Sequence, residues 1–201
     1  MDKLKYKNVI IMVVFLIFSM QFSTKAMHIG EGFLPPMWCL FYYVISAPFF
    51  LNGLKYINKN TSKNKDLKML LAMVAAYCFV LSSIKLPSIA GSSSHPTGTA
   101  LGAILFGPST MSVIGAIVLL FQALFMAHGG LTTLGANTFS MAVVGPIISF
   151  LIYNAFKRRN KKTAVFLSAA LGDLSTYLIT SIQLALAFHT GQEGIAASFI
   201  R

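Results

Sequence analysis

Charged residues are scarce in this sequence. Only 10% of its 201 residues are charged, whereas 56% are hydrophobic. So few ionic groups cannot cover the surface of a water-soluble domain of this size. The composition excludes an ordinary soluble protein and predicts that most of the surface faces membrane lipid.

Acidic residues are even rarer than basic ones. The chain has five Asp and Glu against sixteen Lys and Arg, which gives a formal net charge of +11. A charge of this size can indicate nucleic-acid binding. The basic residues, however, form short clusters between long apolar runs and lack the neighbouring aromatic residues of a nucleic-acid module. This pattern is typical of membrane topology signals, so we expect no nucleic-acid partner.

Common enzyme and cofactor motifs are missing as well. Cys39 and Cys78 each lie alone in an apolar run, which is neither a disulfide framework nor a metal motif. The sequence has no Gly-x-x-x-x-Gly-Lys-Ser/Thr loop for nucleotide phosphates and no His-Glu-x-x-His zinc motif. We therefore expect no catalytic residues and no bound cofactor.

Residues 1–26 have the layout of a secretory signal peptide. Three lysines precede the apolar run Val9–Phe18. The small residues Thr24 and Ala26 occupy the minus-three and minus-one positions that signal peptidase recognises. The run is short for a span, because crossing ~30 Å of hydrocarbon takes roughly 20 apolar residues. The pattern predicts cleavage before Met27, with an uncleaved anchor helix as the alternative.

Six further apolar segments predict an all-α, polytopic membrane bundle in a single metal-binding domain, 27–201. Helices are expected because lipid cannot satisfy open backbone groups, and the alternation of an outer-membrane barrel is missing. The third segment is too short to cross alone and must be partly buried or continue through a bend. The segments are Met37–Leu54, Met69–Ile84, Thr99–Phe106, Met111–Met126, Phe139–Phe156 and Ala164–Phe188.

Two lysine- and arginine-rich loops, within 55–68 and 157–162, orient this bundle. Such loops face the cytoplasm. Counting the crossings from there puts the mature amino terminus outside the cell, and with it His28, His95 and His128. We therefore expect a multi-pass protein of a bacterial cell membrane whose three histidines lie toward the outer face.

The segment that begins Met27-His28 carries the clearest chemistry. After cleavage, the free amine of Met27, the amide nitrogen of His28 and its imidazole can chelate one ion. His95, in a loop of small residues, is the natural fourth donor. Such a nitrogen-rich set suits late first-row divalent metals rather than Mg²⁺ or Ca²⁺. The alternative is that both histidines are ordinary loop residues.

Four other polar residues are weaker candidates. His128 could orient the site or lie at an interface, and Asn137 could bond the His95 or amino-terminal loop or cap a helix. Glu31 could hold the inserted terminus or stay solvated. Asp173 lies within the last span, where an ionisable group suggests a function, but we favour a helix-to-helix hydrogen bond with Ser or Thr.

The motifs resemble those of a known family, the cobalt-specific substrate-binding membrane components of energy-coupling-factor importers, which serve cobalamin biosynthesis. The resemblance runs from about Met27 to the end of the chain. It rests on Met27-His28-Ile29-x-Glu31-Gly32-Phe33-Leu34-Pro35, Gly91-Ser92-x-Ser94-His95-Pro96-Thr97-Gly98-Thr99, Leu101-Gly102-Ala103-Ile104-Leu105-Phe106-Gly107-Pro108, and Gln122-Ala123-Leu124 through Asn137-Thr138-Phe139-Ser140-Met141.

The resemblance implies metal ligation by Met27, His28 and His95. It also implies three kinds of partner: a transmembrane coupling subunit, cytoplasmic ATP-binding subunits and a small auxiliary membrane subunit. The family fold implies seven spans, so we expect that this chain lacks the last one. Related nickel-specific components carry Pro-Asp where this chain has Gly30-Glu31, which favours Co²⁺ and leaves Ni²⁺ as the alternative.

Two other classes of function compete with this interpretation. An intramembrane metalloenzyme would need an open coordination position beside an acid or base, and four nitrogen ligands leave little room for a substrate. A stand-alone channel or carrier should show a polar path or an internal repeat, and we find neither pattern in the sequence.

Overall fold

The computed structural model describes residues 28–62, 64–84, 86–87 and 93–188. The expected signal segment 1–26 and Met27 lie outside these ranges. The described part is helical apart from a pair of two-residue strands. Its elements are α2 (Pro36–Thr61), α3 (Lys65–Ser83), β1 (Leu86–Pro87), β2 (Ser93–Ser94), α4 (Thr99–Phe106), α5 (Pro108–Met126), α6 (Leu134–Asn137), the π-helix η2 (Thr138–Val144), α7 (Gly145–Phe156) and α8 (Lys161–Ala187).

Five segments of the described chain are long and apolar enough to cross a membrane. They correspond to five of the six expected spans. The sixth, Thr99–Phe106, forms the eight-residue helix α4, which rises only ~12 Å. It packs against α5, α7 and α8. As its length requires, α4 is partly buried among other helices, and the count of six crossings stays a prediction. The five segments are Pro36–Thr61, Asp66–Ser83, Pro108–Met126, Leu134–Phe156 and Lys161–Ala187.

Local sequence sets where these helices begin. The side chain of Asn64 accepts the backbone N–H of Asp66 at the start of α3, and Asn160 accepts two backbone N–H groups at the start of α8. Such side-chain caps satisfy donors that a helix leaves open. Gly107, with φ +83°, ends α4, and Pro108 begins α5. The chain therefore turns back between α4 and α5 instead of continuing as one helix.

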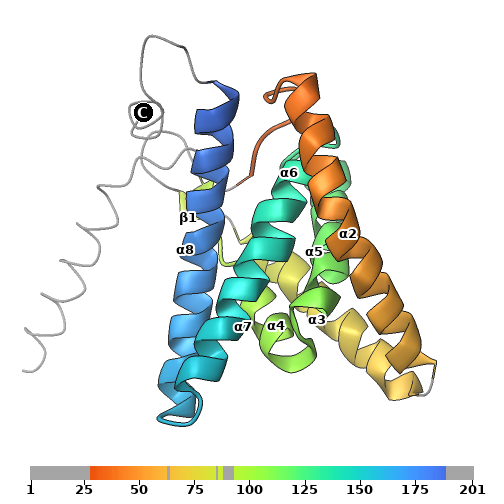
Figure 1. Ribbon diagram of the computed structural model, residues 1–201, viewed down its shortest axis with the longest axis vertical. Helices are drawn as coiled ribbons and strands as arrows, with labels where there is room; N and C mark the ends of the chain where they lie inside the picture. The colour runs from red at the N-terminus through yellow and green to blue at the C-terminus, as the bar shows by residue number, and fades with distance from the viewer. Residues whose placement is uncertain (1–27, 63, 85, 88–92, 189–201) are drawn as a thin grey trace, which may run out of the picture.

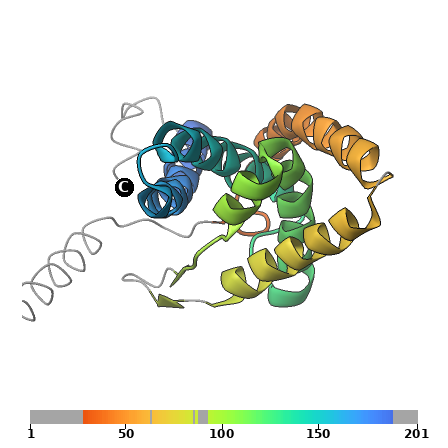
Figure 2. The same cartoon turned by 90° about the horizontal axis from the view of Figure 1, so that it is seen from below.

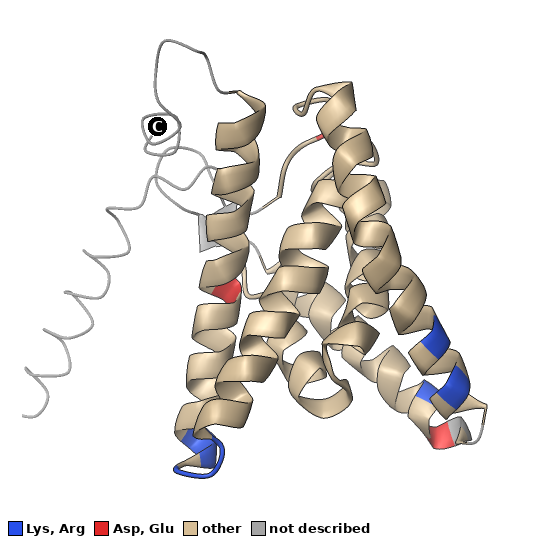
Figure 3. Cartoon of the chain, in the orientation of Figure 1, with Lys and Arg blue, Asp and Glu red and all other residues tan. Residues whose placement is uncertain are grey.

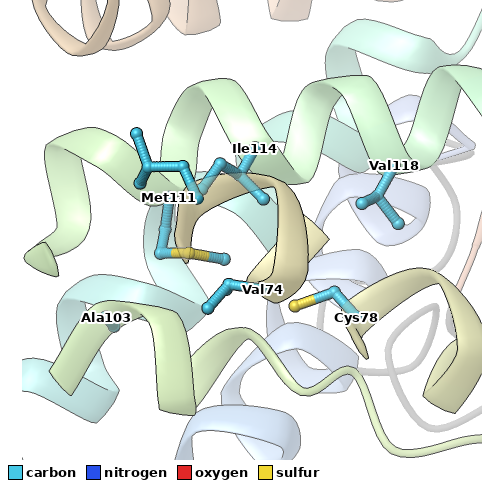
Figure 4. Packing of buried hydrophobic residues seen from close by; sticks show 7 residues of the cluster. Val74, Cys78, Ala103, Met111, Ile114 and Val118 are labelled. Carbon is cyan, nitrogen blue, oxygen red and sulfur yellow. The ribbon is translucent and has the colours of Figure 1, made fainter. Parts of the chain in front are cut away.

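The helices form two groups joined by a buried centre. Figure 2 shows α2 and α3 on one side, α7 and α8 on the other, and α4 and α5 between them. The central cluster in Figure 4 joins α3, α4 and α5 through mostly apolar side chains. Its buried members are Leu71, Val74, Cys78, Ala103, Met111, Ile114 and Val118.

The outer faces of α2 and α3 present large apolar side chains. On α3, the exposed residues Met69, Met73, Tyr77 and Val80 recur at helical spacing along one face. Such a face would be unfavourable in water and is favourable in lipid. This arrangement agrees with the membrane protein expected from the composition.

The two ends of the bundle differ in charge. Figure 3 shows that the basic residues at the α2–α3 end and around the α7–α8 connection lie at the same end of the molecule. The segment before α2 enters at the opposite end and runs back into the bundle between α8 and α2 (Figure 1). Ile29 and Leu34 of that segment are buried against both helices.

Helices α7 and α8 are joined by a reciprocal pair of hydrogen bonds. Ser149 Oγ donates to the carbonyl of Ser168 at 3.0 Å, and Ser168 Oγ donates to the carbonyl of Ser149 at 2.6 Å. Gly172 allows this approach, since a Cβ there would lie 1.9 Å from Ser149 Oγ. A small residue at position 172 is therefore required for the contact.

We expect Gly172→Ala to lower the free energy of unfolding by about 1–3 kcal/mol, because the added methyl group overpacks the contact. The loss should appear in reversible unfolding of the purified protein in mixed detergent and lipid. Leu174→Ala, on an exposed position of the same helix, is the matched control and should change stability much less. Equal losses in both variants would contradict this account of the α7–α8 contact.

Candidate metal centre

Three histidines from separate parts of the chain meet at one point. His28 precedes α2, His95 follows β2, and His128 follows α5. One ring nitrogen of each can be chosen so that all three lie within 4.8 Å of one another. His28 and His95 are only 5% and 3% exposed, and His128 is partly buried. The structure therefore brings together the two expected ligands and the histidine expected to orient them.

The closest pair is His95 and His128. Their Nε2 atoms lie 3.0 Å apart. One of the two nitrogens must carry a proton in this arrangement, since two bare lone pairs would repel each other. The same separation suits two ligands of one ion, because nitrogens bound at ~2.0–2.1 Å and at a right angle lie ~2.9 Å apart.

His28 has one satisfied and one open ring nitrogen. Its Nε2 lies 3.2 Å from Gln122 Oε1, whereas its buried Nδ1 has no hydrogen-bond partner among the described residues. Burial, and then the neighbouring His128 and His95, hold the pKa of His28 well below the usual value of 6.5. The imidazole is therefore neutral at physiological pH, which is the form that binds metal ions.

The segment that carries His28 is held by the backbone of the next residue. Asn137 Oδ1 accepts the N–H of Ile29 at 2.9 Å, and Asn137 Nδ2 donates to the Ile29 carbonyl at 3.0 Å. Thr133 Oγ1 donates to the same carbonyl at 2.7 Å. Asn137 thus bonds the amino-terminal loop, one of the two roles expected for it, and satisfies both backbone groups of Ile29.

A second contact holds the outer part of this segment. Both carboxylate oxygens of Glu31 accept the backbone N–H of Thr132, at 3.3 and 3.1 Å, and Thr132 Oγ1 accepts the N–H of Gly32. These bonds lower the pKa of Glu31. The loop passes so close that a Cβ at Gly130 would lie 2.5 Å from Glu31 Cα. Glu31 therefore anchors the inserted segment to the loop after α5, through Thr132.

The His95 loop is tied to α8. Asp173 accepts a hydrogen bond from the hydroxyl of Thr97 and a longer one, 3.5 Å, from its backbone N–H. We expected Asp173 to bond a Ser or Thr of another helix. The partner is indeed a threonine, but it lies in the loop just after His95 and not on a helix. The physical reason is that α8 runs beside this loop, whose backbone donors need an acceptor.

Comparison with known proteins identifies the family. The family model named CbiM, described as "Cobalt uptake substrate-specific transmembrane region", matches residues 28–200. The chain belongs to the CbiM family. It is therefore a transporter component and not an enzyme, which removes the metalloenzyme alternative.

Individual relatives agree with this assignment. The chain is 61% identical to the cobalt transport protein CbiM of Clostridium tetani (strain Massachusetts / E88), over 94% of this chain and 79% of the relative. It is 56% identical to the CbiM protein of Thermosipho melanesiensis (strain DSM 12029 / CIP 104789 / BI429), over 98% and 83%. A crystal structure described as a truncated transition metal transporter matches with a TM-score of 0.74 and 28% identity, over 85% of each chain.

Sequence reasoning gave no role to several residues that support this CbiM centre. Gln122 and Thr133 bond the amino-terminal segment directly, and Ser82 bonds Gln122. The sequence offered one signal for Gln122, a side-chain amide within the apolar run 108–126. A polar group in a membrane helix rarely lacks a partner. Proximity to His28, however, follows only from the folded structure.

We expect Asn137→Ala to release the amino-terminal segment of this CbiM protein. The change leaves the buried N–H of Ile29 without its acceptor, at a cost of about 1–3 kcal/mol. Hydrogen–deuterium exchange should therefore speed up at residues 29–34 by about 5- to 150-fold, if the segment opens locally. Asn154→Ala is the matched control, because Asn154 donates to the carbonyl one turn back on α7 and accepts from Lys157, away from the amino-terminal segment. Slow exchange at residues 29–34 in Asn137→Ala would contradict the anchoring role.

Proposed function

We propose that this chain captures Co²⁺ outside the cell for ATP-driven uptake that supports cobalamin biosynthesis. Three observations support the proposal. The imidazoles of His28, His95 and His128 converge in a membrane bundle, and that of His28 is neutral. The matching family model is described as a cobalt uptake substrate-specific transmembrane region, and relatives with more than half of their aligned residues identical are named cobalt transport proteins. The convergence of His28, His95 and His128 is the observation that carries the site.

The proposed ligands are the amine of Met27, the amide nitrogen and Nδ1 of His28, and Nε2 of His95. Met27 lies outside the described residues, but its nitrogen belongs to the residue covalently joined to His28. The clamp on Ile29 fixes the direction in which this end of the chain runs. The Nε2 atom of His128 lies 3.0 Å from the Nε2 atom of His95, the nitrogen that the ion would take. His128 acts as the neighbour that orients His95 in the absence of the ion.

Ni²⁺ is the second candidate substrate. The affinity of imidazole and amine nitrogens for divalent ions rises along the first row from Co²⁺ to Ni²⁺, so these ligands alone favour Ni²⁺. Selectivity for Co²⁺ must therefore come from the geometry that the protein imposes. The names of the relatives and the Gly30-Glu31 sequence support Co²⁺.

We further propose that signal peptidase removes residues 1–26 and that the protein is a multi-pass component of a bacterial cell membrane. The segment that carries His28 joins α2 at the end opposite the basic loops (Figures 1 and 3), and basic loops face the cytoplasm. This supports a mature amino terminus outside the cell. The proposed partners are a transmembrane coupling subunit, ATP-binding subunits and a small auxiliary membrane subunit, since the chain contains no phosphate-binding loop of its own.

Equilibrium competition between Co²⁺ and Ni²⁺ on the purified, processed chain tests the site and the substrate together. We expect preferential Co²⁺ binding, weakened by more than about 100-fold in His28→Ala and in His95→Ala, because even an outer partner of a ligand contributes 10–100-fold. The control is His189→Ala, the fourth histidine of the chain. A preference for Ni²⁺ would show that Ni²⁺ and not Co²⁺ is the substrate. Binding that survives both substitutions would show that the proposed ligands are wrongly assigned.

Blocking cleavage should remove metal binding. In Ala26→Leu a bulky residue replaces the small one before the cleavage point, so Met27 keeps an amide nitrogen, which is a far poorer ligand than an amine. We expect the uncut chain, verified by mass, to lose at least about 100-fold in Co²⁺ affinity, more than the loss of an outer partner. The control is a chain synthesised to begin at Met27, which restores the free amine and should bind fully. Equal Co²⁺ affinity of the cut and uncut chains would exclude the amine as a ligand.

A further inference from the structure

A chain of buried hydrogen bonds leads from His28 through α5 to α3. Gln122 on α5 contacts His28 Nε2 through its Oε1 atom at 3.2 Å. The Nε2 atom of Gln122 donates to Ser82 Oγ on α3. Ser82 Oγ in turn donates to the carbonyls of Cys78 at 2.6 Å and Phe79 at 3.0 Å. Gln122 and Ser82 are both 0% exposed, so water does not compete for these groups.

The backbone carbonyls on α3 determine which group donates and which accepts in each of these hydrogen bonds. Backbone carbonyls can only accept, and a serine hydroxyl has a single proton, which the carbonyls of Cys78 and Phe79 take up. Ser82 can therefore only accept from Gln122, so the amide NH₂ of Gln122 faces Ser82. Its carbonyl oxygen then faces His28, and this oxygen requires a proton on Nε2.

We propose that Gln122, oriented by Ser82, is a positioning residue that holds His28 in the Nε2–H tautomer and directs the Nδ1 lone pair at the metal ion. This inference rests on the proposed function, in which His28 is a ligand. A neutral imidazole has one proton, so a protonated Nε2 leaves Nδ1 bare. The buried Nδ1 without a hydrogen-bond partner among the described residues is the atom that this assignment predicts.

The choice of nitrogen matters for chelation. Nδ1 is the ring nitrogen next to the side-chain attachment point, so it can bind the same ion as the amide nitrogen of its own residue in a compact chelate ring. Nε2 is on the far side of the imidazole and points into the bundle toward Gln122. The opposite tautomer would place a proton on Nδ1 and block the chelate. Fixing a ligand's tautomer through its other nitrogen is a general way to raise metal affinity.

The test is the tautomer of His28 itself, measured without metal. Imidazole ¹⁵N chemical shifts of histidine-labelled protein in lipid nanodiscs separate the two nitrogens, and the His28 signals are assigned from their loss in His28→Ala. We expect Nε2–H and bare Nδ1 in the unchanged protein. In Gln122→Met, of similar length but without an acceptor, both tautomers should appear, and Co²⁺ affinity should fall by about 10–100-fold.

A second pair of variants separates positioning from folding. Ser82→Ala leaves Gln122 in place but removes the acceptor that orients its amide, so it should also mix the tautomers. Ser149→Ala removes a buried hydroxyl of the same kind in the α7–α8 contact and should leave the His28 signals unchanged. An Nδ1–H tautomer in the unchanged protein, or bare Nδ1 and full affinity retained in Gln122→Met and Ser82→Ala, would overturn the proposal.

The two hypotheses fail in different ways. If the unchanged protein shows the Nε2–H tautomer and Gln122→Met loses it, the role of Gln122 in positioning His28 is supported even before metal is added. If that same unchanged protein then binds no Co²⁺, the proposed function is wrong. If Co²⁺ binds through His28 while the tautomer is Nδ1–H, the proposed function stands and the role of Gln122 is wrong.

Discussion

The two hydrogen bonds between Asn137 and the backbone of Ile29 are the constraint on which the site depends. They insert an extended segment into a membrane bundle, where an open backbone N–H or carbonyl would be costly. Asn137 can reach that segment from the point where α6 passes into the π-helix η2. Such wide turns often occur at functional sites. Together with the bonds from Gln122 and Thr133, this contact fixes His28 relative to the other two histidines.

The histidines lie in loops, but each loop is bonded to a helix. The amino-terminal segment is bonded to Asn137 and Gln122, and the His95 loop to Asp173 on α8. Ser82 extends the support from α5 to α3. The bundle therefore fixes the arrangement of the imidazoles, although none of the three lies within a helix. A site built in this way responds to relative movement of α3, α5 and α8 because each of these helices is bonded to a different part of it.

The sequence predicts which histidines come together better than it predicts their surroundings. The pairing of His28 with His95 follows from chelate chemistry and from the sidedness of the spans, and the apolar runs predict five long helices. The sequence did not predict that the Nε2 atoms of His128 and His95 would lie 3.0 Å apart. The path of the loop after α5 depends on Ala127 and Gly129, whose φ angles are positive. Gln122 and Thr133 were missed for a related reason. A polar residue in an apolar run shows that a partner is needed, but the partner is set by packing between distant helices.

The charge distribution explains how a chain with a net charge of +11 can bind a divalent cation. The basic clusters lie at the end of the bundle opposite the start of α2, which His28 precedes (Figures 1 and 3). The proposed site uses nitrogen donors, and burial with the neighbouring histidines lowers the pKa of His28, whose imidazole is then neutral. Nitrogen donors suit transition metals, whereas Mg²⁺ and Ca²⁺ require oxygen ligands. A site of this kind would therefore discriminate against these abundant ions by the identity of its ligand atoms.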